Sequence, residues 1–441
     1  MWLLLKGGRV IDPSQGIDDI ADVLVRDGVI AGTGKIELES MDGAPGEVYD
    51  VTGKVVAPGL IDMHVHLREP GDEHKETIAT GAAAAAAGGF TTIVAMPNTH
   101  PAPDSRAVVD LITTEGKKTR VNVLCCGALT KNMAGEEMAE LGEIVEAGAV
   151  AASDDGFPIQ NSLVMRRVME YAGMLNIPVL VHCEDKALTA GAVMNEGIVS
   201  TVVGLRGMPA AAEVSMIERN ILLAELAGCR LHIQHVSCAA SVDVIRLAKA
   251  RGVKVTCETC PQYFTLTDEV LADYDTNTKM NPPLRTAADV EAIKAGLADG
   301  TIDVIATDHA PHSLEDKEVE MTVAAFGIVG LETALPLVVT KLVDDGVMSL
   351  SDAIEKLTAR PAEVLGINRG TLDIGAPADI VVFDPEEEIT VQASKFKSMG
   401  RNTPFDGWKL KGAVIATIAG GKVAYGKLGT ESKEQVILEH A

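Results

Sequence analysis

Between residues 58 and 368 the sequence alternates short apolar runs with segments long enough to form helices, and this alternation constrains the fold more than any other feature. Apolar runs of this length are typical of buried strands. The predicted strands are 60–66, 90–96, 121–126, 149–153, 179–182, 231–235, 253–257 and 304–307. The predicted helices between them include 73–87, 104–117, 241–250 and 286–298.

Eight buried strands alternating with helices predict an α/β protein built on a (β/α)8 barrel of the TIM type, which usually takes ~250 residues before insertions. A doubly wound parallel sheet is the alternative. In a barrel, the side chains at the carboxyl ends of the strands meet at one mouth, and such enzymes place their chemistry there.

The two ends of the chain differ from this middle part. Residues 1–57 contain short strand-like runs separated by turn signals such as Asp27-Gly28 and Thr52-Gly53, and the chain from residue 370 onward has the same pattern. We therefore predict that 1–57 and 369–441 pair into one discontinuous β domain, next to a catalytic barrel at 58–368.

The composition excludes several classes of protein. Apolar residues make up 47% and charged residues 23% of the chain, which is ordinary for a globular protein. With 63 acidic and 38 basic residues the formal net charge is −25, which argues against a nucleic-acid partner or an anionic membrane surface. Seven cysteines without a secretory leader fit a reducing compartment, and the longest apolar stretch is interrupted by Glu332 and Pro336. We expect a cytoplasmic protein.

The end of the first predicted strand carries the sharpest chemical signal, Asp62-Met-His64-Val-His66. Residues two apart on a strand point to the same face, so His64 and His66 are expected to present two imidazoles side by side at the barrel mouth. A single His-x-His pattern is weak evidence by itself. It gains weight here because further candidate ligands end later strands.

Those further candidates are Asp154 and Asp155 after the fourth strand, His182 ending the fifth, His235 ending the sixth and Asp308 after the eighth. Imidazole and carboxylate ligands suit zinc, and a set of this kind with positions left for water is typical of a catalytic metal site. A buried histidine held by an ordinary hydrogen bond is the alternative for any one of them, but not for the whole set. The sequence therefore predicts a metal centre.

The remaining histidines receive other interpretations. On the sixth strand Leu231, Ile233 and His235 are expected to share one face, so His232 should point away from the site in a structural role. His309 follows Asp308 directly and is expected to point away from it, so it should pack in the core or hydrogen-bond to a metal ligand rather than bind the metal itself. His74, His100 and His440 have no comparable context.

Two further patterns carry no chemistry in this interpretation. Cys257-x-x-Cys260 has no second pair at matching spacing, so two buried thiols are the preferred reading over a zinc or redox site. Gly327-Ile-Val-Gly330 lacks the spacing of a phosphate-binding loop.

Together these residues resemble the amidohydrolase superfamily, and within it the bacterial class I dihydroorotases, along nearly the whole chain. The motifs that carry the resemblance are PGLIDMHVHLREPG at 58–71, MPNT at 96–99, SDDG at 153–156, VHCE at 181–184, QHVS at 234–237, KMNPPLR at 279–285 and ATDHAPH at 306–312. The resemblance implies a metal-dependent (β/α)8 barrel with a small β-sandwich formed by both termini. It also implies reversible cyclisation of N-carbamoyl-L-aspartate to L-dihydroorotate in pyrimidine (UMP) synthesis.

The resemblance also implies roles for the candidate ligands. His64 and His66 would bind one zinc ion, His182 and His235 a second, and Asp308 would complete the first site. Many relatives bridge the two metals with a carboxylated lysine, whereas here Asp155 occupies that position and needs no modification. The motif spacing favours Asp155 over Asp154, and the reverse assignment stays open.

The chemistry follows from these residue types. Bound metals lower the pKa of water toward neutrality, and Asp308 would act first as general base and then as general acid at the amide nitrogen. One or two zinc ions per subunit are compatible with the ligand set, with two favoured.

Substrate binding needs a cation for the substrate carboxylate. Arg68 follows His66 by two residues and can hold a carboxylate with two parallel hydrogen bonds, although a surface salt bridge with Glu69 or Asp72 is the alternative. The other substrate positions implied by the resemblance are His66, Asn98, Asn281, His312 and the backbone at Phe326 and Gly327. Residues 313–320 are expected to form a mobile polar loop that closes on the substrate.

Two other functions are weighed against this one. A hydantoinase or allantoinase would use the same scaffold on another cyclic amide. An inactive homologue that serves as a scaffold for aspartate transcarbamoylase would typically have lost metal ligands, whereas this set is complete; an active enzyme could still bind that partner. A homodimer is the default expectation for an enzyme of this size.

Overall fold

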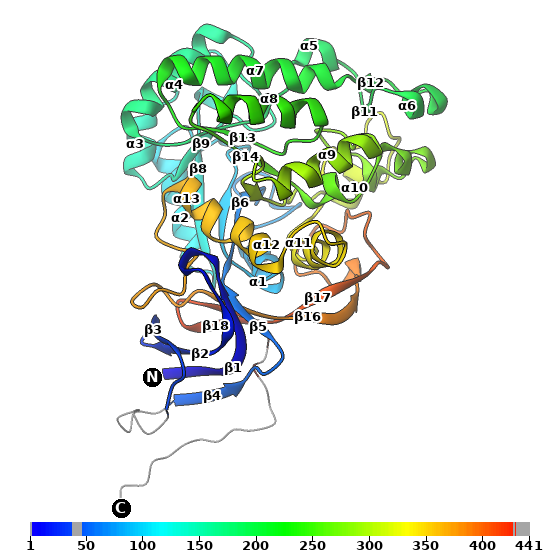
Figure 1. Cartoon of the computed structure of the whole chain (residues 1–441). Helices are drawn as coiled ribbons and strands as arrows, with labels where there is room; N and C mark the ends of the chain where they lie inside the picture. The colour runs from blue at the N-terminus through cyan, green and yellow to red at the C-terminus, as the bar shows by residue number, and fades with distance from the viewer. Residues whose placement is uncertain (1, 38–45, 427, 429–441) are drawn as a thin grey trace, which may run out of the picture.

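A ring of eight parallel strands forms the centre of the molecule (Figure 1). The computed structural model describes residues 2–37, 46–426 and 428. The order of the barrel strands along the sheet follows the order in the chain: β6 (Leu60–Val65), β7 (Phe90–Ala95), β8 (Asn122–Ala128), β9 (Ala151–Ser153), β10 (Val179–Val181), β13 (Leu231–Ile233), β14 (Val255–Thr259) and β15 (Val304–Ile305).

The ring closes between its first and last strands. Val65 at the end of β6 forms a parallel bridge with His309 just after β15, and the His66 amide donates to the His309 carbonyl at 2.9 Å. The (β/α)8 barrel and all eight of its strands are therefore confirmed. A doubly wound sheet is excluded, because its strand order would reverse and its edges would stay open.

Helices cover the outside of this ring (Figure 1). The main ones are α1 (Ile78–Ala87), α2 (Arg106–Gly116), α3 (Leu141–Glu146), α4 (Ser162–Leu175), α7 (Ala210–Ala227), α8 (Ala239–Ala250), α9 (Ala287–Ala298) and α11 (Ala334–Val338). The remaining elements of this part are α5 (Lys186–Thr189), α6 (Ile198–Val203), α10 (Leu314–Lys317), α12 (Leu350–Leu357), α13 (Ala359–Leu365) and the strand pair β11 (Met194–Asn195) and β12 (Gly207–Met208). No helix in the described part of the chain is long and apolar enough to cross a membrane.

The first of these helices begins later than the predicted span 73–87. Thr77 caps it, because its hydroxyl accepts a hydrogen bond from the Thr80 amide and the Thr80 hydroxyl accepts one from the Thr77 amide. Its small alanine side chains, with Ala84 and Ala85 fully buried, let α1 lie close against the sheets on either side.

The side chains of the barrel strands divide between two apolar cores. One face of each strand packs against the helices, for example with Leu60, Phe90 and Leu231. The other face fills the interior of the ring with side chains such as Met63 and Leu180. The candidate ligands, among them His64 and His235, lie at the carboxyl end of this interior.

The two ends of the chain meet in a second, eight-stranded sheet (Figure 1). Its strands are β1 (Trp2–Asp12), β2 (Ile17–Arg26), β3 (Val29–Gly34), β4 (Gly46–Asp50), β5 (Val55–Pro58), β16 (Ile380–Thr390), β17 (Lys409–Ala419) and β18 (Lys422–Gly426). The pairing that joins the two ends is antiparallel, from Val55 opposite Phe383 to Pro58 opposite Ile380.

This terminal sheet curls around its own core. The Ile30 amide of β3 donates to Ala376 at 2.9 Å and the Gly375 amide donates to Ile30 at 2.8 Å, so the far edge of the sheet meets the segment that leads into β16. The domain boundaries at 57/58 and 368/369 stay a prediction, and His440 lies outside the described residues.

A single residue, Gly59, joins the terminal sheet to the barrel. A β-carbon at this position would lie 2.2 Å from the Thr91 side chain, so only glycine lets β5 run directly into β6. The Gly59 amide also donates to the Asp379 carbonyl at 2.8 Å. The strand that carries the first two candidate ligands is therefore anchored in both sheets.

Candidate active site

The end of β6 places two imidazoles against one carboxylate oxygen. His64 Nε2 lies 3.4 Å and His66 Nε2 lies 3.5 Å from Asp155 Oδ2. All three side chains are buried. The predicted juxtaposition of His64 and His66 is thus present, and Asp155 reaches it from the loop after β9.

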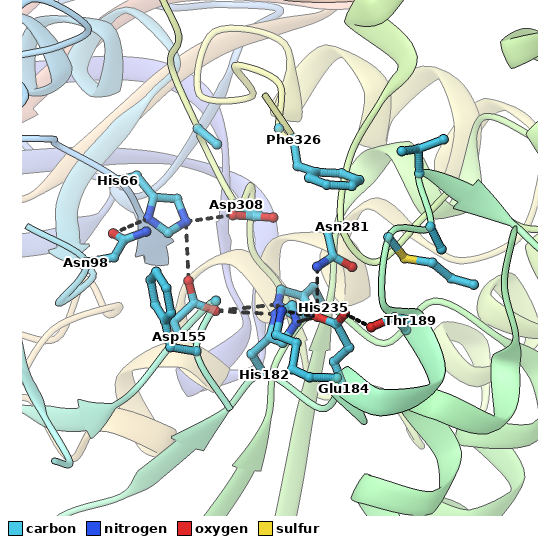
Figure 2. A pocket seen from close by; sticks show the side chains of 18 of the residues that line it. His66, Asn98, Asp155, His182, Glu184, Thr189, His235, Asn281, Asp308 and Phe326 are labelled. Carbon is cyan, nitrogen blue, oxygen red and sulfur yellow. Dashed lines mark hydrogen bonds and ion pairs between the residues drawn. The ribbon is translucent and has the colours of Figure 1, made fainter. Parts of the chain in front are cut away.

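Two more imidazoles face the other oxygen of the same carboxylate. His182 Nδ1 lies 3.8 Å and His235 Nε2 lies 3.6 Å from Asp155 Oδ1, and these two nitrogens are 2.9 Å apart. Figure 2 shows Asp155 between His66 on one side and His182 and His235 on the other. One carboxylate therefore stands between two pairs of histidines.

The donor atoms fit two cations that share Asp155. One group consists of His64, His66 and Asp155, and the other of Asp155, His182 and His235. Within each group, the atoms that could bind a cation lie within 4.8 Å of one another. Two of these buried atoms, His64 Nε2 and Asp155 Oδ1, have no hydrogen-bond partner within the described structure. Such unpaired buried groups are costly unless a ligand satisfies them, and imidazole nitrogen with carboxylate oxygen is a zinc-type donor set.

The protonation of Asp155 agrees with this role. Burial by itself would raise the pKa of Asp155, but the adjacent histidines, His64 foremost, hold it well below its ordinary value. The neighbouring Asp154 turns away from the centre, because its Oδ1 accepts hydrogen bonds from the Leu129 and Thr130 amides. The geometry thus favours Asp155 over Asp154 as the shared ligand.

Asp308 lies on the cavity side of the first histidine pair. Its Oδ1 is 2.9 Å from His66 Nε2 and 3.5 Å from His64 Nε2. Burial would raise the pKa of Asp308, and His64 and His66 lower it below its usual value. The two histidines therefore favour the ionised form of the Asp308 carboxyl group.

Three of the site residues have a left-handed backbone, with φ values of 62° at Arg68, 35° at His235 and 50° at Asp308. Residues with a β-carbon adopt this conformation at a cost of roughly 1–2 kcal/mol each, and such strain is concentrated at functional sites. Here the turns redirect the chain immediately after β6, β13 and β15, so that the side chains point into the mouth.

A cavity of about 530 Å³ opens above the carboxylate and histidines. All predicted site residues except the fully buried His64 line it: His66, Arg68, Asn98, Asp155, His182, His235, Asn281, Asp308, His312, Phe326 and Gly327. Residues more than 200 positions apart in the chain are thus brought to one place. The roles of the individual residues stay predictions.

Arg68 lies at the edge of this cavity rather than in a surface salt bridge. Its Nε donates to the Pro311 carbonyl at 3.2 Å, and its Nη2 lies 3.4 Å from His312 Nε2. The His312 Nε2–H donates to the Phe326 carbonyl at 2.8 Å. His312 therefore links Arg68 to the segment at Phe326 and Gly327.

Gly327 has a conformation and a position that require glycine. Its φ is +121°, and a β-carbon there would lie 2.6 Å from the Ala310 β-carbon. The backbone can therefore approach the cavity with no side chain in the way.

The two asparagines contact the histidine centre in different ways. Asn98 Oδ1 accepts from His66 Nδ1 at 2.7 Å, which leaves the Asn98 amide hydrogens for the cavity. Asn281 instead donates from Nδ2 to Glu184 at 2.9 Å. Each asparagine is thus oriented by a partner that also belongs to the centre.

The structure corrects the interpretation of His232. Leu231 and Ile233 face the helices, so His232 points into the barrel rather than away from it. His232 Nε2 donates to Glu258 Oε2 at 3.1 Å, and Glu258 Oε1 accepts from His64 Nδ1 at 2.6 Å. The alternation was misapplied because the strand ends at Ile233, and the left-handed turn at His235 reverses the facing of that residue.

Glu258 and Glu184 are two residues that the sequence reasoning missed. Glu258 is completely buried in β14, and Glu184 is 6% exposed in the loop after β10. Burial would raise the pKa of Glu184, yet His182 and Lys186 keep it well below its usual value. The available signal was an acid inside an apolar strand for Glu258, and an acid two residues from a candidate ligand for Glu184.

The predicted loop 313–320 contains an unexpected anchor. Lys317 is 3% exposed, and its Nζ donates to the carbonyls of Ala325 at 2.8 Å and Gly327 at 3.1 Å. Burial lowers the pKa of Lys317 to about 7. In this structure the loop is fastened to the segment that lines the cavity, and its closure on a substrate stays a prediction.

The two cysteines of the Cys257-x-x-Cys260 pattern, His309 and His100 lie outside the centre. Cys257 and Cys260 are buried free thiols, and neither belongs to a group of potential cation ligands among the described residues. His309 packs near Glu76, with 3.4 Å between His309 Nε2 and Glu76 Oε2, and accepts from the Gly330 amide at 3.2 Å. His100 is on the surface.

Comparison with solved structures defines the class of protein. The L-hydantoinase of Arthrobacter aurescens superimposes with a TM-score of 0.87 at 28% identity and 97% coverage of both chains. The D-hydantoinase of a Thermus species gives a TM-score of 0.82 at 27% identity, covering 97% of this chain and 96% of that one. Fold and site together define a barrel amidohydrolase.

Comparison with sequences narrows the class to one family. A family model described as Dihydro-orotase-like matches residues 53–241. The dihydroorotase of Pelotomaculum thermopropionicum is 57% identical over 423 residues, covering 96% of this chain and 98% of the relative. That of Geobacter sp. (strain M21) is 55% identical over 426 residues, covering 96% and 99%. The chain belongs to the dihydroorotase family.

Proposed function

We infer that this chain catalyses the reversible cyclisation of N-carbamoyl-L-aspartate to L-dihydroorotate, as a zinc-dependent dihydroorotase of class I. The observation that carries the inference is the arrangement of Asp155 between two histidine pairs, beneath a cavity whose edge holds Arg68. Relatives at 51–57% identity that are named dihydroorotase support the same activity.

The six ligand residues would hold two zinc ions. His64, His66 and Asp308 would form the first site, His182 and His235 the second, and Asp155 would contribute to both. Zinc held by these residues would supply an acidified water molecule and would polarise the amide carbonyl of the substrate. The protein's contribution is to supply these donors in a buried position, already oriented by Glu258, Asn98 and Glu184.

Asp308 moves the proton in this scheme. In the hydrolytic direction it accepts a proton from the attacking water and delivers it to the departing amide nitrogen, and in the biosynthetic direction it returns that proton. Its ionised state and its place at the cavity surface suit the first of these steps.

The cavity edge selects the substrate. Arg68 and the amide of Asn98 provide hydrogen-bond donors for the carboxylate that distinguishes dihydroorotate from hydantoin, and His312 lies beside Arg68 at the same edge of the cavity. Asn281 and the exposed backbone at Phe326 and Gly327 remain for the ring amides. Discrimination by such polar contacts is strong, because an analogue without the carboxylate leaves Arg68 unpaired.

The test is a substrate panel with a metal analysis on the same sample. Purified protein is offered L-dihydroorotate, hydantoin and allantoin, and its zinc content is measured. We expect turnover of dihydroorotate only, with up to two zinc ions per chain, and loss of activity on chelation that added zinc restores. Preferred turnover of hydantoin, or full activity without metal, would overturn the inference.

Three further proposals accompany this function. We propose that the protein works in the cytoplasm, that it forms a homodimer and that it can associate with aspartate transcarbamoylase. Light scattering of the purified chain, alone and mixed with aspartate transcarbamoylase, tests the last two.

A further inference from the structure

The contacts of Glu184 extend beyond the orientation of His182. Its Oε2 accepts from His182 Nε2 at 3.0 Å, from Asn281 Nδ2 at 2.9 Å and from Lys186 Nζ at 2.6 Å. Its other oxygen accepts from the Thr189 hydroxyl. Figure 2 shows Glu184 below Asn281 and beside His182, at the wall of the cavity. One carboxylate oxygen therefore joins a proposed metal ligand to a proposed substrate residue.

The contact to His182 determines which nitrogen of that ring is free. Because Nε2 carries the proton that is donated to Glu184, Nδ1 keeps its lone pair, and Nδ1 is the nitrogen that faces Asp155 and His235. A carboxylate behind a ligating histidine fixes its tautomer and ring orientation, and its loss typically weakens metal binding about 10–100-fold.

The contact to Asn281 determines how that amide is turned. A carboxylate accepts hydrogen bonds only, so it must face Asn281 Nδ2 and not Oδ1. Asn281 lines the cavity, and Oδ1 is then the atom it offers there. An acceptor at this place fits an N–H group of the substrate ring.

We propose that Glu184 is a positioning residue that couples the His182–His235 metal site to substrate binding at Asn281. The proposal rests on the proposed function. A cation on His182 holds that ring in place, the ring holds Glu184, and Glu184 holds Asn281 in its binding orientation. Substrate then binds a preorganised site, and by reciprocity a bound substrate tightens the second metal.

The experiment uses zinc and orotate, a planar analogue that keeps the ring amides and the carboxylate. Zinc affinity is measured by competition with a chelator, and orotate affinity by calorimetry with one and with two equivalents of zinc. For the wild type we expect the second equivalent to tighten orotate binding by about 5-fold or more, within the usual range of coupling between sites.

Three variants separate the carboxylate from its surroundings. Glu184→Ala should weaken the second zinc about 10–100-fold and make orotate affinity independent of it. Glu184→Gln keeps an acceptor oxygen and should retain part of the coupling. Asp185→Ala is the matched control, because Asp185 only caps α5 through the Ala187 and Leu188 amides, and it should leave the coupling intact.

The outcomes are distinguishable. If Glu184→Ala, folded as judged by circular dichroism, keeps the wild-type dependence of orotate affinity on zinc, the inference is wrong. It is equally wrong if Asp185→Ala reproduces the Glu184→Ala effect, because loosening of the loop would then be the cause. A wild type that neither turns over dihydroorotate nor binds orotate would instead contradict the proposed function.

Discussion

The two halves of the histidine centre are supported in different ways. Behind His64 stand Glu258 and His232, all three of them fully buried inside the barrel. Behind His182 stands Glu184, which lines the cavity and contacts Lys186, a side chain that is 43% exposed. We call the first set the enclosed half and the second the cavity half.

This difference separates stability from ligand binding. Groups in the enclosed half have no access to water, so their charges and hydrogen bonds must be balanced within the fold. Groups in the cavity half can exchange partners with water or substrate. Substitutions in the enclosed half should therefore affect folding, and substitutions in the cavity half should affect binding.

The largest effect is expected from Asp308→Ala, since Asp308 lies 3.5 Å from His64 of the enclosed half yet faces the cavity. Loss of a general acid–base group should lower kcat about 10³–10⁴-fold, equivalent to roughly 4–5.5 kcal/mol. Steady-state kinetics and metal analysis measure this. A variant with bound zinc and nearly normal turnover would remove Asp308 from the mechanism.

Glu258→Ala tests the enclosed half directly. The variant leaves His64 Nδ1 and His232 Nε2 without their carboxylate acceptor in the barrel interior. Breaking such a buried pair should lower the free energy of unfolding by about 3–5 kcal/mol. Urea unfolding of metal-free protein gives the value, with Glu184→Ala as the comparison. If the two variants lose equal free energy of unfolding, the enclosed half and the cavity half do not differ in their contribution to stability.

Arg68→Lys tests the edge of the cavity. Lysine keeps the charge but not the paired donors of guanidinium, so KM for dihydroorotate should rise about 10–100-fold, or roughly 1.5–3 kcal/mol. The metal content should not change. Unaltered KM would mean that the substrate carboxylate binds elsewhere.

The smallest effect concerns Lys317, a buried cation bonded to carbonyl oxygens. Its pKa is about 7 in the folded protein, lowered by burial from 10.5. Between pH 7 and pH 10.5 the Lys317 amine holds a proton in the unfolded chain but not in the folded chain, so the free energy of unfolding increases as pH rises. Below about pH 7 the amine is protonated in both states, and the stability no longer depends on pH through this group.

The matched variant is Lys317→Met, which cannot titrate. Relative to it, the free energy of unfolding of the wild type should increase by roughly 2 kcal/mol from pH 7 to pH 9. Urea unfolding at the two pH values measures the change. Parallel pH profiles for the two proteins would show that Lys317 keeps its proton throughout.

The periodicity of the chain was sufficient to predict the barrel. Its strands are buried on both faces and its helices lie between them, so apolar runs mark nearly every element. The His64 and His66 pair followed from the same alternation, because His64 lies in β6 and His66 comes directly after the last residue of that strand.

The details of the centre did not follow from periodicity. His235 and Asp308 reach the site through left-handed turns, which break the alternation from which side-chain direction was predicted. Glu258 meets His64 across 194 residues, and no local pattern shows which buried acid will face which histidine. Partners of this kind are determined by tertiary structure alone.

The pairing of β5 with β16 also has a consequence for the order in which the chain is made. On a ribosome, β5 emerges roughly 320 residues before its partner, a delay of about 15–60 s at ordinary rates of synthesis. During that time the barrel strands are completed while one edge of the N-terminal sheet stays open. A chain that stops before residue 380 would keep this edge exposed, and exposed edges are targets for aggregation and proteolysis. The last strands thus protect the first, so the earliest part of the protein to be synthesised is among the last to be finished.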